Sequence, residues 1–251
     1  MNFIKENLIK LRNLSNLRPV YLNKYTDQGS SISDSFIFRN DNNFQTIFRF
    51  SDLPKLMDSN DTSEVEIQLF DFDNNFLCEH IVKNINKSNE INIGEILRKK
   101  KIDIQNGIFY IFHKTNEKNS SKNIFSNRCY VGFSFKNSLY SFVHGNGYVK
   151  SRRMDKRKYN FDIYKSSIIC KHRFKIQNNY KDFDKVELVF NNPLSTNLKL
   201  KIFGKKYLIK CGCTKIIEIS NVKVVEFISN CFHLRPVVFT YKKNFFDVHH
   251  A

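Results

Sequence analysis

Short runs in which apolar and polar residues alternate recur along most of the chain, and they restrict the fold more than any other feature. In FQTIFRF, residues 44–50, three phenylalanines and a threonine share one face of an extended strand, because successive side chains point to opposite faces. Residues 64–70, EVEIQLF, alternate in the same way. Many such runs, separated by Asn-rich and Asp-rich turns, predict an all-β protein built from antiparallel sandwiches of immunoglobulin-like or jelly-roll-like type.

The segment 129–148 predicts a β-hairpin. Two alternating runs flank a polar turn: Val131, Phe133 and Phe135 before it, and Tyr140, Phe142 and His144 after it. If the connecting loop has an even number of residues, both aromatic sets fall on one face of the hairpin. His144 would then end an aromatic row, just before the bend at residues 145–147.

The chain has 251 residues, of which 41% are hydrophobic and 14% aromatic, so packed cores are expected rather than disorder. We expect two β-sandwich modules packed together, at residues 27–149 and, smaller, at 164–251. A short amphipathic helical arm at 1–26 precedes them, packed on the body, and a solvated basic linker at 150–163 separates them. Within the first module, the polar residues 27–34, DQGSSISD, predict a loop.

The formal net charge is +17, from 41 Lys and Arg against 24 Asp and Glu. A chain so basic attracts anions in general, including nucleic acid, anionic lipid headgroups and acidic polysaccharides. Lys outnumbers Arg, and Asn and Ile are frequent, as the codons of an AT-rich genome would favour. The sequence therefore leaves open whether the charge is functional or compositional.

The six cysteines are scattered, and no C-x-x-C pair occurs. Cys211 and Cys213 would share a strand face, but two thiols do not make a metal site. Reduced thiols, no metal and no cofactor are therefore expected. The N-terminus lacks the continuous apolar core of a signal peptide, and no run reaches membrane-spanning length, so a cytoplasmic protein is expected.

Polar clusters interrupt the apolar strands, and an isolated arginine precedes a proline in LRPVVF, where a buried guanidinium would need an acceptor. The residues that we predict to bind a ligand are Asp34, Arg39, Asp41, Asn43, His144, Asn146, Arg235, Asp247 and His249.

These groups and the positive charge favour a non-catalytic protein that binds a polar, anionic ligand, such as an acidic glycan or a sugar-acid precursor of a surface polysaccharide. Tyr130, Tyr140 and Tyr148 could stack on sugar rings, although the chain has no Trp, which counts against a lectin.

Two alternatives remain. In a hydrolase, an aspartate such as Asp247 would orient the imidazole of His249, with His144 and Asp34 converging on the same pocket, although no nucleophile motif is present. In a nucleic-acid-binding protein the basic linker would contact phosphates, although no recognition motif is visible. The sequence specifies neither a reaction nor an oligomeric state.

Overall fold

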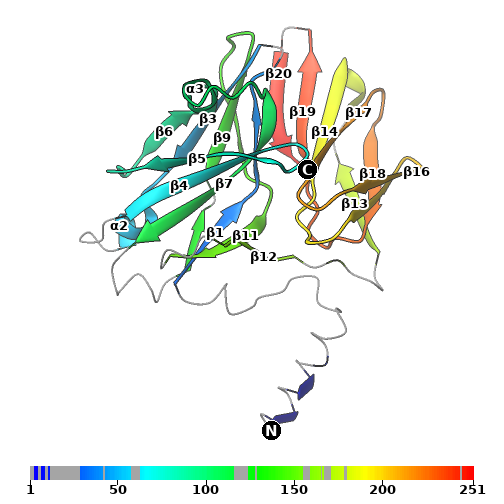
Figure 1. Ribbon diagram of the computed structural model, residues 1–251. Helices are drawn as coiled ribbons and strands as arrows, with labels where there is room; N and C mark the ends of the chain where they lie inside the picture. Colours follow the sequence, from blue (N-terminus) through cyan, green and yellow to red (C-terminus); the bar gives the residue numbers. More distant parts are fainter. Residues whose placement is uncertain are drawn as a thin grey trace.

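The computed structural model describes residues 29–41, 43–57, 63–115, 124–127, 129–154, 159–164, 166, 171–177, 180–243 and 245–251, together with residues 3, 4, 7, 8 and 11. Nearly all regular structure in these ranges is β-strand, arranged in five four-stranded sheets (Figure 1). The predicted all-β, multi-sandwich class is confirmed.

Three sheets belong to the N-terminal half of the chain. Sheet I has the order β2 (Phe36–Arg39), β7 (Asn106–Thr115), β4 (Ser63–Asp71) and β5 (Phe76–Val82). Sheet II has the order β10 (Ser141–His144), β9 (Tyr130–Phe135), β3 (Phe44–Phe50) and β6 (Asn89–Asn92). Sheet III has the order β12 (Phe161–Asp162), β11 (Tyr148–Arg153), β1 (Ser30–Asp34) and β8 (Ile124–Asn127).

Two sheets form the C-terminal half. Sheet IV has the order β13 (His172–Gln177), β18 (Val224–Ser229), β15 (Leu198–Ile202) and β16 (Lys205–Ile209). Sheet V has the order β17 (Thr214–Ile219), β14 (Lys185–Asn191), β19 (Val237–Lys242) and β20 (Phe245–His250). The helical segments between strands are α2 (Leu53–Met57), α3 (Ile93–Lys99) and a 3-10 turn at Tyr180–Asp182.

Sheets I and II pack face to face through phenylalanines. The ring centroid of Phe48 on β3 lies 4.8 Å from that of Phe36 and 4.9 Å from that of Phe109. Sheets IV and V pack in the same way, with Phe190 and Phe227 at 5.3 Å. Each half of the chain therefore contains a sandwich with its own aromatic core.

The apolar face of sheet II is shared between the two halves. Phe48 and Phe50 cover sheet I, whereas Phe44 at the other end of β3 packs against sheet V, 6.0 Å from Phe239 and 5.1 Å from Phe246. Such aromatic pairs contribute about 0.5–1.5 kcal/mol each beyond the area that they bury. The single face predicted for residues 44–50 is therefore correct, and it joins both sandwiches.

The hairpin at 129–148 forms, but its two aromatic sets lie on opposite faces. β9 and β10 pair His144 with Tyr130, and Phe142 with Gly132. In this register even-numbered residues pair with even-numbered ones, and odd with odd. Phe142 and His144 therefore share a face with Gly132 and Tyr130 and point away from the buried Phe133. The prediction of one shared face is wrong, because it depended on the parity of the loop.

The polar segment predicted as a loop is instead buried strand β1, which continues directly into β2. β1 and β7 belong to different sheets, and serine hydroxyls of β1 accept hydrogen bonds from backbone amides of β7. The Ile111 amide donates to Ser33 Oγ over 2.9 Å, and the His113 amide donates to Ser31 Oγ over 3.0 Å. Side-chain hydroxyls therefore satisfy backbone donors that would otherwise be buried without partners.

The expected basic linker at 150–163 also differs from the structure. Residues 150–153 belong to β11, which pairs with β1 and packs on the outer face of sheet I, where the Arg152 guanidinium lies 5.6 Å from the Phe112 ring centroid. Residues 155–158 lie outside the described residues. The division of the chain into modules at this point stays a prediction.

Few residues of the arm at 1–26 are described. Phe3, Ile4, Leu8 and Leu11 are helical, as predicted, and are 64–77% exposed, so their apolar face is not buried on the body. Across the described residues, no helix is both long and apolar enough to cross a membrane.

Candidate functional site

The first predicted cluster is divided between two buried places. Asp34 ends β1 inside the protein, close to Gly145, where an added Cβ would lie only 2.3 Å from Asp34 Cβ. Asn146 lies on the same bend, and its amide donates to Ser35 O over 2.7 Å. Asn146 thus helps to hold the bend after β10, and Asp34 is buried beside that bend.

Arg39 joins the two halves of the molecule. Its guanidinium, 4% exposed as a residue, binds Asp41 in bidentate fashion at 3.0 and 2.9 Å, and its Nη1 donates to Glu187 Oε2 on sheet V over 2.5 Å. The guanidinium carbon also lies 4.5 Å from the Phe44 ring centroid. Arg39 and Asp41 were predicted to bind a ligand, but their charges are occupied inside the protein.

Glu187 completes this network. Tyr241 donates its hydroxyl to Glu187 Oε2 over 2.7 Å, and Lys185 lies 2.8 Å from Oε1. Burial raises the pKa of the Glu187 carboxyl, but Arg39, Lys185 and Tyr241 lower it by more, so its pKa lies below the ordinary value. The carboxylate is therefore ionised and fully partnered, as a buried charge must be to be tolerated.

The predicted Asp247–His249 pair lies where β20 meets β10. Ser141 Oγ donates to Asp247 Oδ1 over 2.7 Å, and His249 Nδ1 lies 3.8 Å from Asp247 Oδ2. The carboxylate thus stands between the hydroxyl and the imidazole, whereas in a hydrolytic triad the imidazole stands between the other two. Burial lowers the pKa of His249, with Asp247 opposing it. In this order the Ser141 hydroxyl donates to the carboxylate and not to the imidazole.

His144 and Arg235 have separate surroundings. The His144 ring lies on Tyr130, with centroids 4.1 Å apart, and its Nδ1 is 3.3 Å from Cys129 O. Arg235 was expected to be buried but is exposed, and its Nε donates to Ala251 O over 3.0 Å. Of the four residues of the hydrolase hypothesis, Asp247 and His249 lie together, whereas His144 lies on Tyr130 and Asp34 lies beside Gly145.

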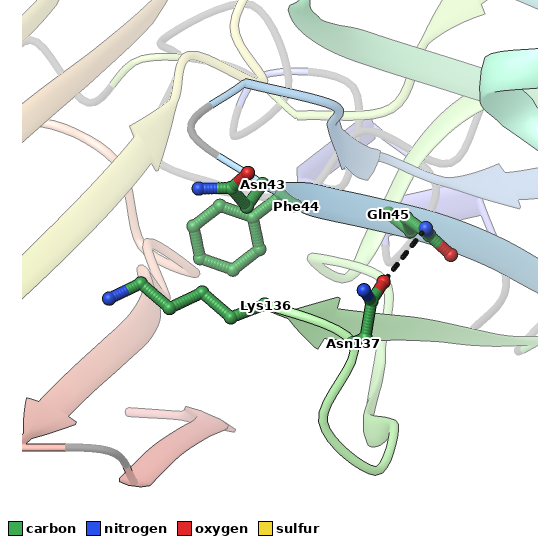
Figure 2. Close-up of a pocket in the computed structure, with 5 residues that line it drawn as sticks. All are labelled: Asn43, Phe44, Gln45, Lys136 and Asn137. Carbon is green, nitrogen blue, oxygen red and sulfur yellow. Dashed lines mark hydrogen bonds between the residues drawn. The ribbon is translucent and has the colours of Figure 1, made fainter.

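Asn43, one of the predicted residues, lines an open pocket. The pocket has a volume of about 310 Å³ and lies between the turn before β3 and the turn after β9 (Figure 2). Its lining residues are Asn43, Phe44, Gln45, Lys136 and Asn137. Figure 2 shows the Lys136 side chain extending past the ring of Phe44, with Asn43 beside the same ring and Gln45 facing Asn137.

Turn chemistry builds this pocket. Asn43, Lys136 and Asn137 have φ values of 68°, 52° and 58°, a left-handed conformation that Asn tolerates well. The Ser138 amide donates to Phe135 O over 3.0 Å, which closes the tight turn after β9. The Lys136 amide donates to Asn43 O over 3.0 Å and so ties the two turns together.

The pocket's polar groups form a short chain. Gln45 Nε2 donates to Asn137 Oδ1 over 3.4 Å, and the Tyr140 hydroxyl donates to Gln45 Oε1 over 3.3 Å. Lys136 is exposed, and no carboxylate within the described ranges forms an ion pair with it. The pocket is thus lined by amide donors and acceptors and by one lysine without a carboxylate partner among the described residues.

A second, larger pocket of about 420 Å³ lies between β5, β6 and α3. Its lining residues are His80, Glu90, Ile91, Asn92, Glu95, Ile96, Lys99 and Lys100. Glu90 accepts from Arg49 Nε over 2.7 Å, and Asn92 caps α3 by accepting from the Glu95 amide. Charges of both signs are present and several groups are used, so this pocket favours no ligand class.

Sequence reasoning missed two features. Lys136, Gln45 and Asn137 were not singled out, although a Lys-Asn turn between aromatic strands was visible. A buried ion cluster was also missed: Glu66, inside sheet I, pairs with Arg152 and Lys114. Burial raises the pKa of Glu66, but Arg152 and Lys114 lower it by more, so the pKa lies below its ordinary value. This cluster attaches sheet III to sheet I.

Metal ligation has no support in the described part of the chain, where no group of three or more His, Cys, Asp or Glu side chains could hold an ion. Cys78, Cys129, Cys211, Cys213 and Cys231 are free thiols. Cys170 lies outside the described residues.

Comparison with known proteins adds little. No protein-family model matches the sequence, and no curated protein does. Among solved structures, the chain aligns with a protein of Bacteroides fragilis assigned as a beta-galactosidase, with a TM-score of 0.17 and 8% identity. The alignment covers 89% of this chain and 32% of the other, so this chain spans about a third of that protein's length. A likeness this slight carries no information on activity.

Proposed function

We propose that this protein binds, without chemically changing it, a polar ligand with an acidic group, such as an acidic glycan or a sugar-acid precursor of a surface polysaccharide. The observation that carries the proposal is the pocket lined by three amide side chains and by Lys136, an exposed lysine whose side chain extends past the ring of Phe44. Amides donate to and accept from hydroxyls, and an ammonium group binds a carboxylate through charge-assisted hydrogen bonds. A sugar acid presents both kinds of group.

The overall charge supports an acidic ligand. A net charge of +17 attracts anions over distances of about a Debye length, roughly 8–10 Å in physiological salt. The predicted cations Arg39 and Arg235 do not serve as binding groups in this proposal, because each already donates to an acceptor within the protein. Lys136 is the cation that faces the pocket.

The two alternatives have less support. A hydrolase of the triad type would need an imidazole to accept the proton of the nucleophile, and Ser141 instead donates to the Asp247 carboxylate. A nucleic-acid-binding linker would need free cations, whereas Lys150 pairs with Asp162 and Arg152 pairs with Glu66. Nucleic-acid binding by residues 155–158 stays a prediction.

Titration of ¹⁵N-labelled protein with glucuronic acid and with glucose, followed by NMR, tests the proposal. The side-chain amide signals of Asn43, Gln45 and Asn137 are expected to shift with glucuronic acid. Lys136→Gln should weaken this affinity about tenfold, since a hydrogen bond to a charged group contributes about 1.5–3 kcal/mol and about 1.4 kcal/mol is tenfold. The affinity for glucose should stay the same.

Lys201→Gln is the matched control, because Lys201 is an exposed lysine of β15 in the other half of the chain. It should leave the affinity for glucuronic acid unchanged. Equal affinity for the two sugars, the same loss in both variants, or no shift of the three amides would overturn the proposal.

A further inference from the structure

The outer face of sheet II, opposite its phenylalanine core, continues from the pocket across four strands. The register places its residues in rows. One row runs His144, Tyr130, Arg49, Glu90, and the next runs Phe142, Gly132, Ile47, Asn92. Gln45 and Ser134 form a third pair, beside the pocket. Side chains from β10, β9, β3 and β6 thus form one continuous surface.

Aromatic rings occupy the β9–β10 side of this surface. Tyr130 is 49% exposed and lies on His144. Phe142 lies across the backbone of Gly132, where an added Cβ would lie 2.5 Å from the Phe142 ring. A glycine at this position therefore lets the ring lie flat on the sheet, which gives a level aromatic platform instead of a ridge.

Polar groups accompany the rings. Arg49 lies 4.5 Å from the Phe142 ring centroid and pairs with Glu90, and the two side chains of that ion pair are 53% and 48% exposed. An ion pair so exposed contributes little to stability, so its groups can exchange partners with a ligand at little cost. Tyr140 joins this polar set to the pocket through its hydrogen bond to Gln45.

We infer that the ligand is a chain of several acidic sugars that starts in the Lys136 pocket and lies across Tyr140, Phe142 and Tyr130 on the outer face of sheet II. This inference rests on the proposed function and names its ligand class. From Gln45 to Arg49 the strand advances roughly 13 Å at about 3.3 Å per residue, which is longer than one sugar ring. Sugar rings present C–H faces that pack on aromatic rings and hydroxyls that reach Arg49 and Gln45.

The chemistry of the face favours this occupant over a protein. A surface that docks an apolar partner needs exposed aliphatic groups, and Ile47 in the middle of the face is 5% exposed, beneath its neighbours. Rings, amides and the Arg49–Glu90 ion pair remain, and the net charge of the chain is +17. An anionic polysaccharide complements the rings, the amides and the net charge.

Binding of oligogalacturonates of one to six sugars, measured by calorimetry and NMR, tests the inference. Affinity is expected to rise at least tenfold from one sugar to four. Tyr130→Ala should reduce the affinity for the tetramer about tenfold, because it removes an aromatic ring on which a sugar packs, and leave the single sugar unaffected. Arg49→Gln should act in the same direction, and thermal unfolding checks that both variants fold.

Tyr159→Ala is the matched control, because Tyr159 is 76% exposed and lies away from sheet II. Affinity that does not grow with length, with binding still dependent on Lys136, would overturn this inference and leave the proposed function intact. Absence of binding at every length would overturn both. Equally tight, Tyr130-dependent binding of polyglutamate, or a dimer dissociated by Tyr130→Ala, would show that the face serves a protein.

Discussion

Replacing Arg39 with alanine should lower the free energy of unfolding, because Arg39 joins the two halves of the molecule through Glu187. The change removes one cation and leaves the Asp41 and Glu187 carboxylates, whose side chains are 10% and 5% exposed, without it. Removing one partner of a buried ion pair costs about 3–5 kcal/mol, because the remaining charge is buried and uncompensated. Lys185 still pairs with Glu187 after the substitution, so we expect the lower end, about 3 kcal/mol.

Urea unfolding followed by circular dichroism measures this loss, since the chain has no Trp for fluorescence. Arg49→Ala is the control: it removes an arginine from an ion pair on an exposed face and should cost about 1 kcal/mol or less. The double variant with Glu187→Ala should show a coupling energy of about 1 kcal/mol or more. A loss for Arg39→Ala no larger than that for Arg49→Ala would refute the buried, bridging role.

Two further predictions concern stability. Gly107→Ala should destabilise the protein by about 3 kcal/mol in urea unfolding, because the added Cβ would lie 2.1 Å from the Phe70 carbonyl oxygen. Gly204→Ala is the control and should cost only about 1 kcal/mol, because φ is 77° there and nothing lies within 4 Å of the added Cβ. Equal losses in the two variants would count against the steric argument. Burial lowers the pKa of His113 to about 4, against the hydrogen bond that its ring donates to Ser51 O, so the unfolded chain takes up the proton first and stability should fall as the pH drops from 6.5 to 4. His113→Gln should flatten this pH dependence by about 3 kcal/mol, and an unchanged slope would contradict the assignment.

Part of the fold follows from local pattern alone. Strands β3 and β4 lie where alternation predicts them, and one face of β3 is buried throughout its apolar positions. Alternation is a property of neighbouring residues, so it survives whatever the rest of the chain does. The hairpin of β9 and β10 was predicted for the same reason.

The faces of that hairpin could not be predicted, because a one-residue change in loop parity moves every side chain of a strand to the other side. His144 and Phe142 therefore belong to the outer surface and not to the core row with Phe133. The aromatic surface on the outer face of sheet II could not be predicted either. Its rows combine the β9–β10 hairpin with β3 and β6, which only the folded chain brings beside it.

In strands with clear alternation, such as β3 and β4, the sequence by itself determined that the residues are extended and which of them share a face. Only the tertiary structure decided which polar groups remain available. Arg39 is neutralised by Glu187, 148 residues away, and the serines of β1 are buried because β7 supplies amides for their hydroxyls. A charge or hydroxyl is free or satisfied according to the partner that folding brings to it, and that partner leaves no mark in the local sequence.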